Sequence, residues 1–286
     1  MKSCLLIVNT FKKEARALAT SIGSFLKEQQ VSVSEYAYDG TADYVAEGKV
    51  KTLASHSDFV VTLGGDGTVL FASRECAELG IPVFPVNLGE FGFLAGVSQN
   101  AWKDELLRFL DGKSPVSERS LVACEVLRGG KTVFKTTALN DVVISSIAAS
   151  RLVNMEVAFN HALLGPFKAN GIIVSTATGS TAYSAAAGGP IIDPSLDALL
   201  LTPISSFSLS ARPLLFSPQG ELAITMLPSR IQTGLSADGQ IDFALEAEDV
   251  IILRTAEKKA QLVASSQVQF YAALRSKLNW AGGPRA

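Results

Sequence analysis

The fold is decided by the stretch Val60-Val61-Thr62-Leu63-Gly64-Gly65-Asp66-Gly67-Thr68. Residues 59–63 are almost wholly apolar, which is typical of a strand buried on both faces of a parallel sheet. Three glycines then surround a single acid, and residues 69–79 follow with the apolar spacing of a helix. Because glycines permit a close approach to the backbone, this strand, turn and helix together predict an anion-binding turn.

Asp66 is the unusual residue of this turn, because it places a negative charge where a bound phosphate is expected. A carboxylate in that position either helps to hold a divalent metal ion or meets the hydroxyl that receives a phosphoryl group. The alternative is an ordinary turn in which the aspartate only favours the bend. The turn by itself leaves these interpretations open.

The composition indicates a chain with a large apolar core. Of 286 residues, 48% are hydrophobic, which is enough for two domains. The net charge of −2 offers no surface for nucleic acid and no basic tract for a membrane, and no apolar run approaches the ~20 residues of a spanning helix. Cys4, Cys76 and Cys124 are isolated, as expected for buried thiols in a reducing cytosol, so we expect a cytoplasmic protein.

Strand-like and helix-like segments alternate through the first part of the chain. We expect strands at residues 4–9, 31–36, 59–63 and 81–86 and helices at 12–29, 69–79 and 102–110. This order predicts a doubly wound α/β domain with a parallel sheet at residues 1–98. Ligands bind beyond the carboxyl ends of the strands in such sheets, which is where residues 64–68 fall. A second glycine loop at residues 87–94 either fills the core or lines a ligand site.

Strand-like segments dominate the rest of the chain. They are expected at residues 120–127, 131–138, 141–145, 152–159, 171–176, 221–226, 241–245 and 250–254, with hairpin turns at Gly129-Gly130 and Asp238-Gly239-Gln240. This pattern predicts a β-rich second domain, either a sandwich or a folded sheet, at residues 99–263. Residues 267–278 form a closing amphipathic helix, and we expect residues 264–286 to return to the first domain.

Two segments of the second domain carry candidate ligand-binding groups. Asn140-Asp141 precedes an apolar strand and can hydrogen-bond adenine and ribose hydroxyls, or can simply form a turn. Residues 170–184 begin with a β-branched strand that ends in five hydroxyl side chains around Gly179, followed by a short helix that Ser180 or Thr181 would cap. Five hydroxyls exceed the requirement of one cap, so a ligand-facing loop is favoured over capping alone.

Other features of the sequence are less informative. Arg151 and Lys168 are more often solvated charges than substrate clamps, unless they face the same cleft. The sequence contains neither G-x-x-x-x-G-K-[ST] nor G-x-G-x-x-G, so neither the usual P-loop nor the usual Rossmann fingerprint applies.

Taken together, these segments resemble the NAD kinase family over nearly the whole chain and in the same order. The resemblance is carried by Gly64-Gly65-Asp66-Gly67-Thr68, the loop 87–94, Asn140-Asp141, residues 170–184 with Gly188-Gly189-Pro190, and the ending Phe270-Tyr271, Leu274-Arg275 and Lys277-Leu278-Asn279-Trp280. Diacylglycerol and sphingosine kinases share the glycine-rich signature, so residues 178–184 are what make the match specific.

The resemblance implies ATP-dependent phosphorylation of the 2′-hydroxyl of the adenosine ribose of NAD, giving NADP, in a cleft between the two domains. By this analogy Asp66 accepts the proton of that hydroxyl, and Gly67 lines a phosphate turn with Gly64, Gly65 and Thr68. Asn140 and Asp141 would hold the adenosine part, with Thr181, Ala182 and Tyr183 around the adenine. The further positions that match dinucleotide contacts are Arg151, Lys168, Asn170, Thr178, Ser184, Ala185, Ala186 and Gln240.

The resemblance also implies a divalent metal ion, Mg²⁺ carried in with ATP, and a homodimer or homotetramer in which a neighbouring subunit can complete the site. The sequence shows no acidic metal cage, so we name no metal ligand from the protein. An aspartate with an ordinary pKa of ~3.9 is a weak base. A loose phosphoryl-transfer transition state needs little activation of the nucleophile, so Asp66 need only orient the hydroxyl and take its proton late.

The sequence departs from the family pattern at three places. Asn170 stands where the family usually has Asp, Ala177 replaces a usual Pro, and Ser206-Phe207 replaces a usual Pro-His. Asn170 is expected to contact the nicotinamide end, so the loss of charge there leaves open the affinity and the choice between NAD and NADH. The sequence also does not decide between ATP and polyphosphate as donor. Two alternative functions also stay open at this point: a kinase that phosphorylates a lipid or sugar, and a sensor that binds a dinucleotide without catalysis.

Overall fold

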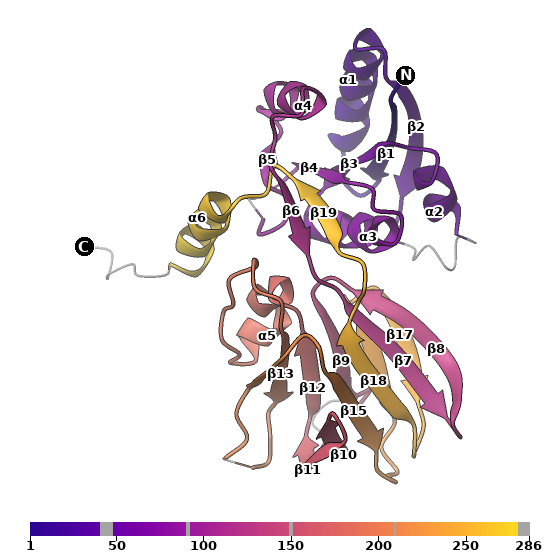
Figure 1. The fold of residues 1–286 in the computed structure, drawn as a ribbon, viewed down its shortest axis with the longest axis vertical. Helices are drawn as coiled ribbons and strands as arrows, with labels where there is room; N and C mark the ends of the chain where they lie inside the picture. Colours follow the sequence, from indigo (N-terminus) through magenta and orange to yellow (C-terminus); the bar gives the residue numbers. More distant parts are fainter. Residues whose placement is uncertain (41–47, 90–91, 149–150, 209, 280–286) are drawn as a thin grey trace. The chain divides into compact units, whose positions relative to one another are not determined.

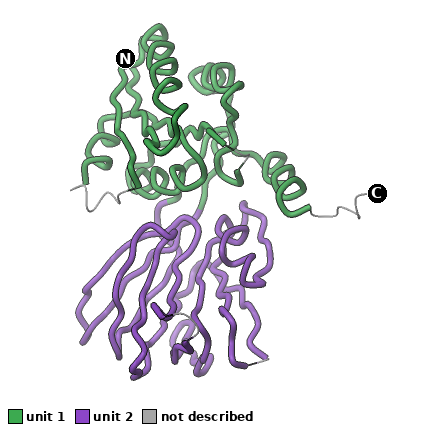
Figure 2. Tube along the Cα trace, turned by 180° about the vertical axis from the view of Figure 1, so that it is seen from behind, with its two compact units in different colours: residues 1–119, 259–286 green, residues 120–258 purple. Residues whose placement is uncertain are grey.

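The computed structural model describes residues 1–40, 48–89, 92–148, 151–208 and 210–279. The chain divides into two compact units (Figure 2). The first unit consists of Met1–Arg119 together with Lys259–Ala286, and the second unit consists of Ser120–Lys258. These boundaries differ from the predicted divisions at 98/99 and 263/264. The reason is that β6 (Val116–Arg119) and β19 (Ala260–Val263) pair with each other and complete the sheet of the first unit. Three residues of the segments that carry the resemblance lie outside the described residues: Glu90, Phe91 and Trp280.

The first unit is built on one sheet with strand order β2-β1-β3-β4-β19-β6, and β5 pairs with β4 (Figure 1). The first four strands run parallel, as the alternating segments predict. The strands of this sheet other than β6 and β19 are β1 Ser3–Asn9, β2 Ser32–Tyr38, β3 Phe59–Gly64, β4 Val83–Asn87 and β5 Val97–Ser98. The helices of the unit are α1 Ala15–Glu28, α2 Lys49–Ala54, α3 Asp66–Ala77, α4 Trp102–Leu110 and α6 Gln267–Leu278.

The core of this unit explains why the sheet is parallel and covered. Every residue of β3 is buried, which is typical of a central strand with both faces covered. Ile22 and Leu26 of α1 belong to one buried cluster with Phe59, Val61 and Leu63 of β3, so α1 packs on the sheet through its apolar stripe. The predicted α/β class of the first domain is therefore confirmed.

Helix α3 begins at Asp66, three residues before the predicted start of its apolar pattern. Gly65 has extended backbone angles, φ −109° and ψ −167°, and its carbonyl accepts hydrogen bonds from the N–H groups of Thr68 and Val69. Asp66 therefore lies in the first helical turn, where the helix dipole favours a negative charge.

The second unit consists of two six-stranded antiparallel sheets, with orders β11-β10-β15-β18-β7-β8 and β14-β13-β12-β9-β16-β17. The predicted β-rich class is confirmed. The strands are β7 Val122–Arg128, β8 Lys131–Ala138, β9 Asp141–Ser146, β10 Val153–Phe159, β11 Ala162–Ala169, β12 Gly171–Ser175, β13 Leu199–Ile204, β14 Leu214–Phe216, β15 Glu221–Met226, β16 Thr233–Ala237, β17 Ile241–Leu245 and β18 Val250–Thr255. A 3₁₀ turn at Thr178–Thr181 and the short helix α5 (Tyr183–Ala186) connect β12 to β13.

Both predicted hairpin turns are present in this unit. Gly129 and Gly130 connect β7 to β8 with φ of 57° and 74°. Asp238 and Gly239 connect β16 to β17 with φ of 53° and 64°. Positive φ at both central residues matches the twist of the flanking strands, as in type I′ hairpins.

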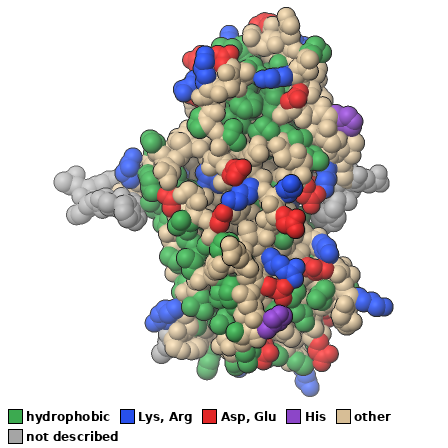
Figure 3. All heavy atoms as spheres, viewed as in Figure 1, with side chains coloured by type: hydrophobic (Ala, Val, Ile, Leu, Met, Phe, Trp, Pro, Cys, Tyr) green, Lys and Arg blue, Asp and Glu red, His purple; other side chains and the backbone are tan. Residues whose placement is uncertain are grey.

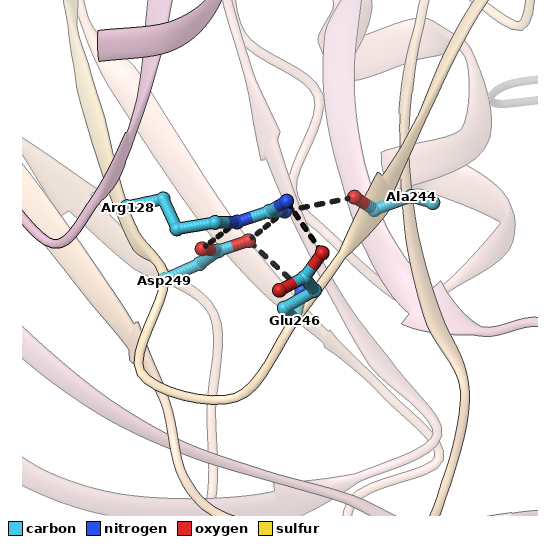
Figure 4. Close-up of polar contacts among 4 residues, drawn as sticks. All are labelled: Arg128, Ala244, Glu246 and Asp249. Atoms are coloured by element: carbon cyan, nitrogen blue, oxygen red, sulfur yellow. Dashed lines mark hydrogen bonds and ion pairs between the residues drawn. The ribbon is translucent and has the colours of Figure 1, made fainter. Parts of the chain in front are cut away.

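A buried ion pair ties β7 to the turn before β18 (Figure 4). The guanidinium of Arg128 donates from Nε and Nη2 to the two carboxylate oxygens of Asp249, at 2.8 and 2.9 Å. The Asp249 side chain is fully buried and also accepts a hydrogen bond from the backbone N–H of Glu246 at 2.8 Å. Burial acts to raise the pKa of Asp249, but the bonds from Arg128 and Glu246 outweigh it and hold that pKa below its ordinary value.

The surface carries charges of both signs. On the face drawn in Figure 3, acidic and basic side chains are interspersed among apolar and neutral ones. None of the helices in the described residues combines the length and the apolar character that crossing a membrane requires.

Candidate active site

Asp66 is held by the backbone of a neighbouring loop in the first unit. Its Oδ2 accepts a hydrogen bond from the N–H of Phe93 at 2.9 Å. Its Oδ1 accepts hydrogen bonds from the N–H groups of Leu94 and Ala95, at 3.3 and 2.9 Å. A carboxylate has about four acceptor positions, two on each oxygen. Oδ1 is therefore fully used, whereas Oδ2 keeps one position with which it can accept a bond from a hydroxyl.

Gly92 makes this arrangement possible. A Cβ atom at Gly92 would lie 1.9 Å from Asp66 Oδ1 and 2.6 Å from Cγ, much closer than real contacts allow. The sequence left open whether the loop 87–94 fills the core or lines a ligand site. Leu94 is indeed buried, but the main contribution of the described part of the loop is its backbone N–H groups, which fix the direction of the Asp66 carboxylate.

The predicted phosphate turn is also held by contacts of its own residues. Thr68 is buried, and its Oγ1 accepts a hydrogen bond at 2.9 Å from Nδ2 of Asn9, at the end of β1. Gly64 permits this packing, because a Cβ there would lie 2.2 Å from Thr68 Oγ1. A Cβ at Gly65 would meet open space, and Gly67 is exposed. The side chain of Thr68 thus braces the turn, Gly67 is its exposed residue, and Gly65 is half-buried.

Asn140 and Asp141 are held between two turns of the second unit. On one side, the Asp238 carboxylate accepts hydrogen bonds from the N–H groups of Leu139, Asn140 and Asp141, at 2.9, 2.7 and 3.2 Å. On the other side, Thr176 donates from Oγ1 to the Leu139 carbonyl at 2.6 Å and from its backbone N–H to the Asn140 carbonyl at 2.9 Å. The structure thus brings Asn140 and Asp141 next to the turn at Thr178–Thr181 and next to the hairpin turn that precedes Gln240.

Most hydroxyls of the run 175–184 are structural. Ser180 Oγ donates to the Ala177 carbonyl at 2.7 Å and accepts from the Ile192 N–H at 2.9 Å. Thr181 Oγ1 donates to the Thr178 carbonyl at 3.2 Å. The N-cap of α5 is Ala182, without a side-chain cap, so the prediction that Ser180 or Thr181 caps this helix is wrong. The hydroxyls instead satisfy the polar groups of a buried, tightly folded loop.

The exposure of the same loop separates its residues into two groups. Thr178 and Ser184 are buried, and Ser184 Oγ pairs with Thr202 Oγ1 at 2.8 Å. Tyr183, by contrast, is 47% exposed, and Thr181 and Ala182 are half-buried. Ala185 is half-buried and Ala186 is exposed, so these two residues, like Thr181, Ala182 and Tyr183, have surface that is open to a ligand.

A cavity of about 180 Å³ brings together three of the predicted site residues, Arg151, Asn170 and Tyr183. Its other lining residues are Ser145, Ser146, Ala148 and Ile204. Lys168 does not line this cavity: it is exposed, and its Nζ lies 5.6 Å from the centre of the Phe207 ring. Phe207 stands where the family usually has His, so this departure gives Lys168 an aromatic neighbour.

Asp141 is the most perturbed carboxyl group near this site. Its residue is 5% exposed, and burial together with the nearby Asp238 carboxylate raises the pKa of Asp141 to about 7. Close to neutral pH, Asp141 therefore exists both as a carboxylate that accepts hydrogen bonds and as a neutral acid that can donate one.

Comparison with known proteins identifies the family. The ATP-NAD kinase N-terminal domain matches residues 4–114, and the ATP-NAD kinase C-terminal domain matches residues 139–265. The chain is 42% identical over 283 residues to the NAD kinase of Treponema denticola, covering 99% of this chain and 98% of that protein. The chain belongs to the NAD kinase family.

Solved structures of NAD kinase relatives share the fold. The yeast NADH kinase complexed with NADH superposes with a TM-score of 0.87 at 22% identity, covering 99% of this chain and 89% of that chain. The NAD kinase of Archaeoglobus fulgidus in complex with ATP superposes with a TM-score of 0.77 at 22% identity, covering 99% of this chain and 100% of that chain. The resemblance seen in the sequence is therefore confirmed for both domains.

Three residues that hold the site of this NAD kinase family member in place were not predicted from the sequence to do so. They are Asp238, read only as a turn residue, Gly92, read only as part of a glycine loop, and Asn9, read only as the end of a strand. Each acts on a segment distant in sequence, as in the bond from Asn9 to Thr68. An acid in a hairpin turn beside a buried strand is the one signal that could have pointed to Asp238.

Replacing Gly179 with alanine is expected to destabilise the protein by about 1–3 kcal/mol, the usual cost of overpacking. A Cβ at Gly179 would lie 2.0 Å from the carbonyl oxygen of Asn140, which is backbone and is already fixed by Thr176. Urea titration of the variant measures the change. Gly234→Ala serves as control, since its Cβ would meet Ile147 at 3.5 Å and the Phe243 carbonyl at 3.8 Å, which are ordinary contact distances. Equal stability of the two variants would show that the turn can move away from Asn140.

Proposed function

We propose that this chain transfers the γ-phosphoryl group of ATP to the 2′-hydroxyl of the adenosine ribose of NAD, forming NADP and ADP. Membership of the NAD kinase family supports the substrates. The observation that carries the mechanism is the geometry of Asp66, whose Oδ1 is fully used by backbone donors while Oδ2 retains one acceptor position.

In the proposed reaction, the ribose 2′-hydroxyl donates a hydrogen bond to Asp66 Oδ2. The hydroxyl oxygen forms the new bond to the γ-phosphorus as the bond between that phosphorus and the β–γ bridging oxygen breaks. The proton passes to Asp66 late, because a loose transition state leaves little need for early deprotonation. In this proposal the glycine turn at Gly64, Gly65 and Gly67 lies against the phosphates, because glycines permit a close approach to the backbone.

The second unit supplies the residues proposed to hold the dinucleotide. Asn140 and Asp141 would bind the adenosine part, and Thr181, Ala182 and Tyr183 would surround the adenine. Arg151 and Asn170 would contact the dinucleotide in the cavity that they share with Tyr183. The remaining proposed contacts are Lys168, Thr178, Ser184, Ala185, Ala186 and Gln240.

A divalent cation, Mg²⁺ bound to ATP, is part of the proposal and would neutralise charge on the phosphates. Within the described residues no group of three or more His, Cys, Asp or Glu side chains is placed to hold a metal ion. Mg²⁺ usually keeps several waters and binds through substrate phosphates and one or two carboxylates. In this proposal the triphosphate carries the ion into the site.

We also propose that the protein is cytoplasmic and forms a homodimer or homotetramer. Its cysteines are free and buried, which suits a reducing compartment. Leu163 and Leu164 on the edge strand β11, and Leu215 on the edge strand β14, are between 42% and 62% exposed. Exposed apolar side chains on sheet edges are typical of surfaces that pair with another chain.

The direct test mixes purified protein with ATP, Mg²⁺ and NAD and reads NADP with an NADP-specific dehydrogenase. We expect NADP to accumulate with a stoichiometric amount of ADP. Binding of NAD without formation of NADP would favour a sensor that binds the dinucleotide without catalysis. If a lipid or sugar is supplied as acceptor, a phosphorus-31 spectrum that shows its phosphorylated form would favour a lipid or sugar kinase. Repeating the assay with polyphosphate and with NADH settles the donor and the redox form.

The KM for NAD is expected to fall about tenfold between pH 6 and pH 8. An acid with a pKa of about 7 is about one-tenth ionised at pH 6, and only the ionised Asp141 accepts hydrogen bonds from ribose hydroxyls at both oxygens. Initial rates at varied NAD check this, with the KM for ATP as internal reference. In Asp141→Asn the pH dependence of the KM for NAD should disappear. If it persists there, another group is responsible.

A further inference from the structure

We propose that Asp238 is a positioning residue for the dinucleotide, which acts through the backbone of residues 139–141 and not by touching the ligand. The inference rests on the proposed function, because it assigns to Asp238 the placement of Asn140 and Asp141. Neither the turn nor the strand needs an acid there to form: asparagine and glycine are equally suited to the positive φ of 53° at this position.

The contact between Asp238 and this segment is reciprocal. The Asp238 carboxylate receives the three N–H groups of Leu139, Asn140 and Asp141, at 2.9, 2.7 and 3.2 Å. The backbone N–H of Asp238 in turn donates to the carbonyl of Asp141 at 2.9 Å. Three successive N–H groups converge on one carboxylate only if the backbone turns around it, so the carboxylate dictates the path of the chain into β9.

The opposite side of the same segment is fixed by neutral groups. Thr176 binds the carbonyls of Leu139 and Asn140, and Gly179 packs directly on the Asn140 carbonyl. The N–H groups of residues 139–141 are bound by Asp238, and the carbonyls of Leu139 and Asn140 are bound by Thr176. The backbone of this segment is therefore held in a single conformation. The side chains of Asn140 and Asp141 are then presented in fixed directions, which lowers the entropic cost of binding a ligand.

Asp238 also supplies the charge that faces Asp141. The register partner of Asp141 on β12, Ser175, is neutral, whereas the turn between β16 and β17 carries the Asp238 carboxylate, which is bound to the Asp141 N–H. The Asp238 carboxylate therefore opposes ionisation of Asp141, in addition to the effect of burial. Removing that charge should shift the ionisation of Asp141 to lower pH, an effect that a purely structural residue would not have.

The test compares Asp238→Asn with Asp242→Asn, which changes an exposed carboxylate of the same hairpin. Asparagine keeps the size and the turn preference of Asp238, but its amide nitrogen cannot accept a bond from an N–H. We expect the KM for NAD to rise about tenfold to a hundredfold in Asp238→Asn, from the loss of bonds to a charged acceptor. The KM for ATP should stay within about twofold, and the pH midpoint of kcat/KM for NAD should move to lower pH. Asp242→Asn should match the wild type.

Calorimetric titration with NAD separates this inference from the proposed function. If the wild type binds NAD but forms no NADP, the proposed function fails, whereas a weaker binding of NAD to Asp238→Asn still supports the role of Asp238. Unchanged NAD affinity and an unchanged pH midpoint in Asp238→Asn would overturn the inference. An Asp238→Asn protein that melts far below the wild type even with saturating NAD would also overturn it, since Asp238 would then be a residue of the fold alone.

Discussion

Replacing Asp66 with asparagine is expected to lower kcat for NADP formation by about 10²- to 10⁴-fold, the usual contribution of a general base. The amide has the same size but cannot take up the proton of the ribose hydroxyl. Calorimetric titration should show NAD affinity close to that of the wild type, because the proposed dinucleotide contacts are elsewhere. Asp66→Ala should lose at least as much activity, since it also releases the N–H groups of Phe93 and Ala95.

Gly92→Ala tests whether the direction of the carboxylate matters as well as its presence. The added Cβ would lie 1.9 Å from Asp66 Oδ1, so the carboxylate or the loop must move. A displacement of about 1 Å can cost 10²-fold in rate, and we expect a loss of that order in kcat. Gly23→Ala is the control, because its Cβ would meet only Leu6 at 4.0 Å. If Asp66→Asn kept the kcat of the wild type, Asp66 would not be the proton acceptor.

Replacing Asp249 with alanine is expected to lower the free energy of unfolding by about 3 kcal/mol, in the range found when one partner of a buried pair is removed. The Asp249 side chain is fully buried and accepts three hydrogen bonds from Arg128 and Glu246. The variant also removes the acceptor of the Glu246 N–H, a partly buried hydrogen bond. Urea titration measures the loss, with Asp242→Asn as the control at an exposed carboxylate.

The contribution of Asp249 should also depend on pH in a defined direction. Its pKa is lower in the folded protein than its ordinary value, so the ionised form is favoured by folding. The stabilisation is fully present above the unfolded pKa of ~3.9 and is lost as the pH falls through the folded value. The difference in stability between wild type and Asp249→Ala should thus be constant from pH 7 to 5 and shrink below pH 4. A difference that stays constant down to pH 3 would contradict the pair.

Much of the fold could be predicted because many of its strands, helices and turns have a clear pattern in the local sequence. The apolar run at 59–63 and the alternation of strand-like and helix-like segments before it are enough to predict a parallel sheet. Gly129-Gly130 is enough to predict a hairpin turn. Among the strands that were missed, two carry weak or interrupted patterns, whereas β13 was missed although it begins with three buried leucines. The edge strand β11 contains Gly165 with φ 120° followed by Pro166, and β16 contains Gly234 in a short run with little apolar content. Their pairing comes from tertiary contacts that the local sequence does not encode.

The candidate site was predictable in its residue types but not in its support. Asp66 and Asn140-Asp141 stand out because acids and amides follow or precede buried strands. Their partners are far away along the chain: Ala95 lies 29 residues from Asp66, and Asp238 lies 98 residues from Asn140. A hydrogen bond from a backbone N–H group to a side chain requires no particular amino acid at the donor position, since almost every residue carries that group. Such bonds therefore cannot be predicted from the residue types.

The way in which Asp66 is held has a consequence for how substrate preference can diverge among related enzymes. Its donors at Phe93, Leu94 and Ala95 are peptide groups, which any amino acid except proline provides. Leu94 and Ala95 are buried, so the half-buried Phe93 is the position of this segment whose side chain can be exchanged without removing a donor to the carboxylate. An inhibitor that contacts the Phe93 side chain could therefore be evaded by substitution there with little loss of activity, whereas Gly92 has no such freedom.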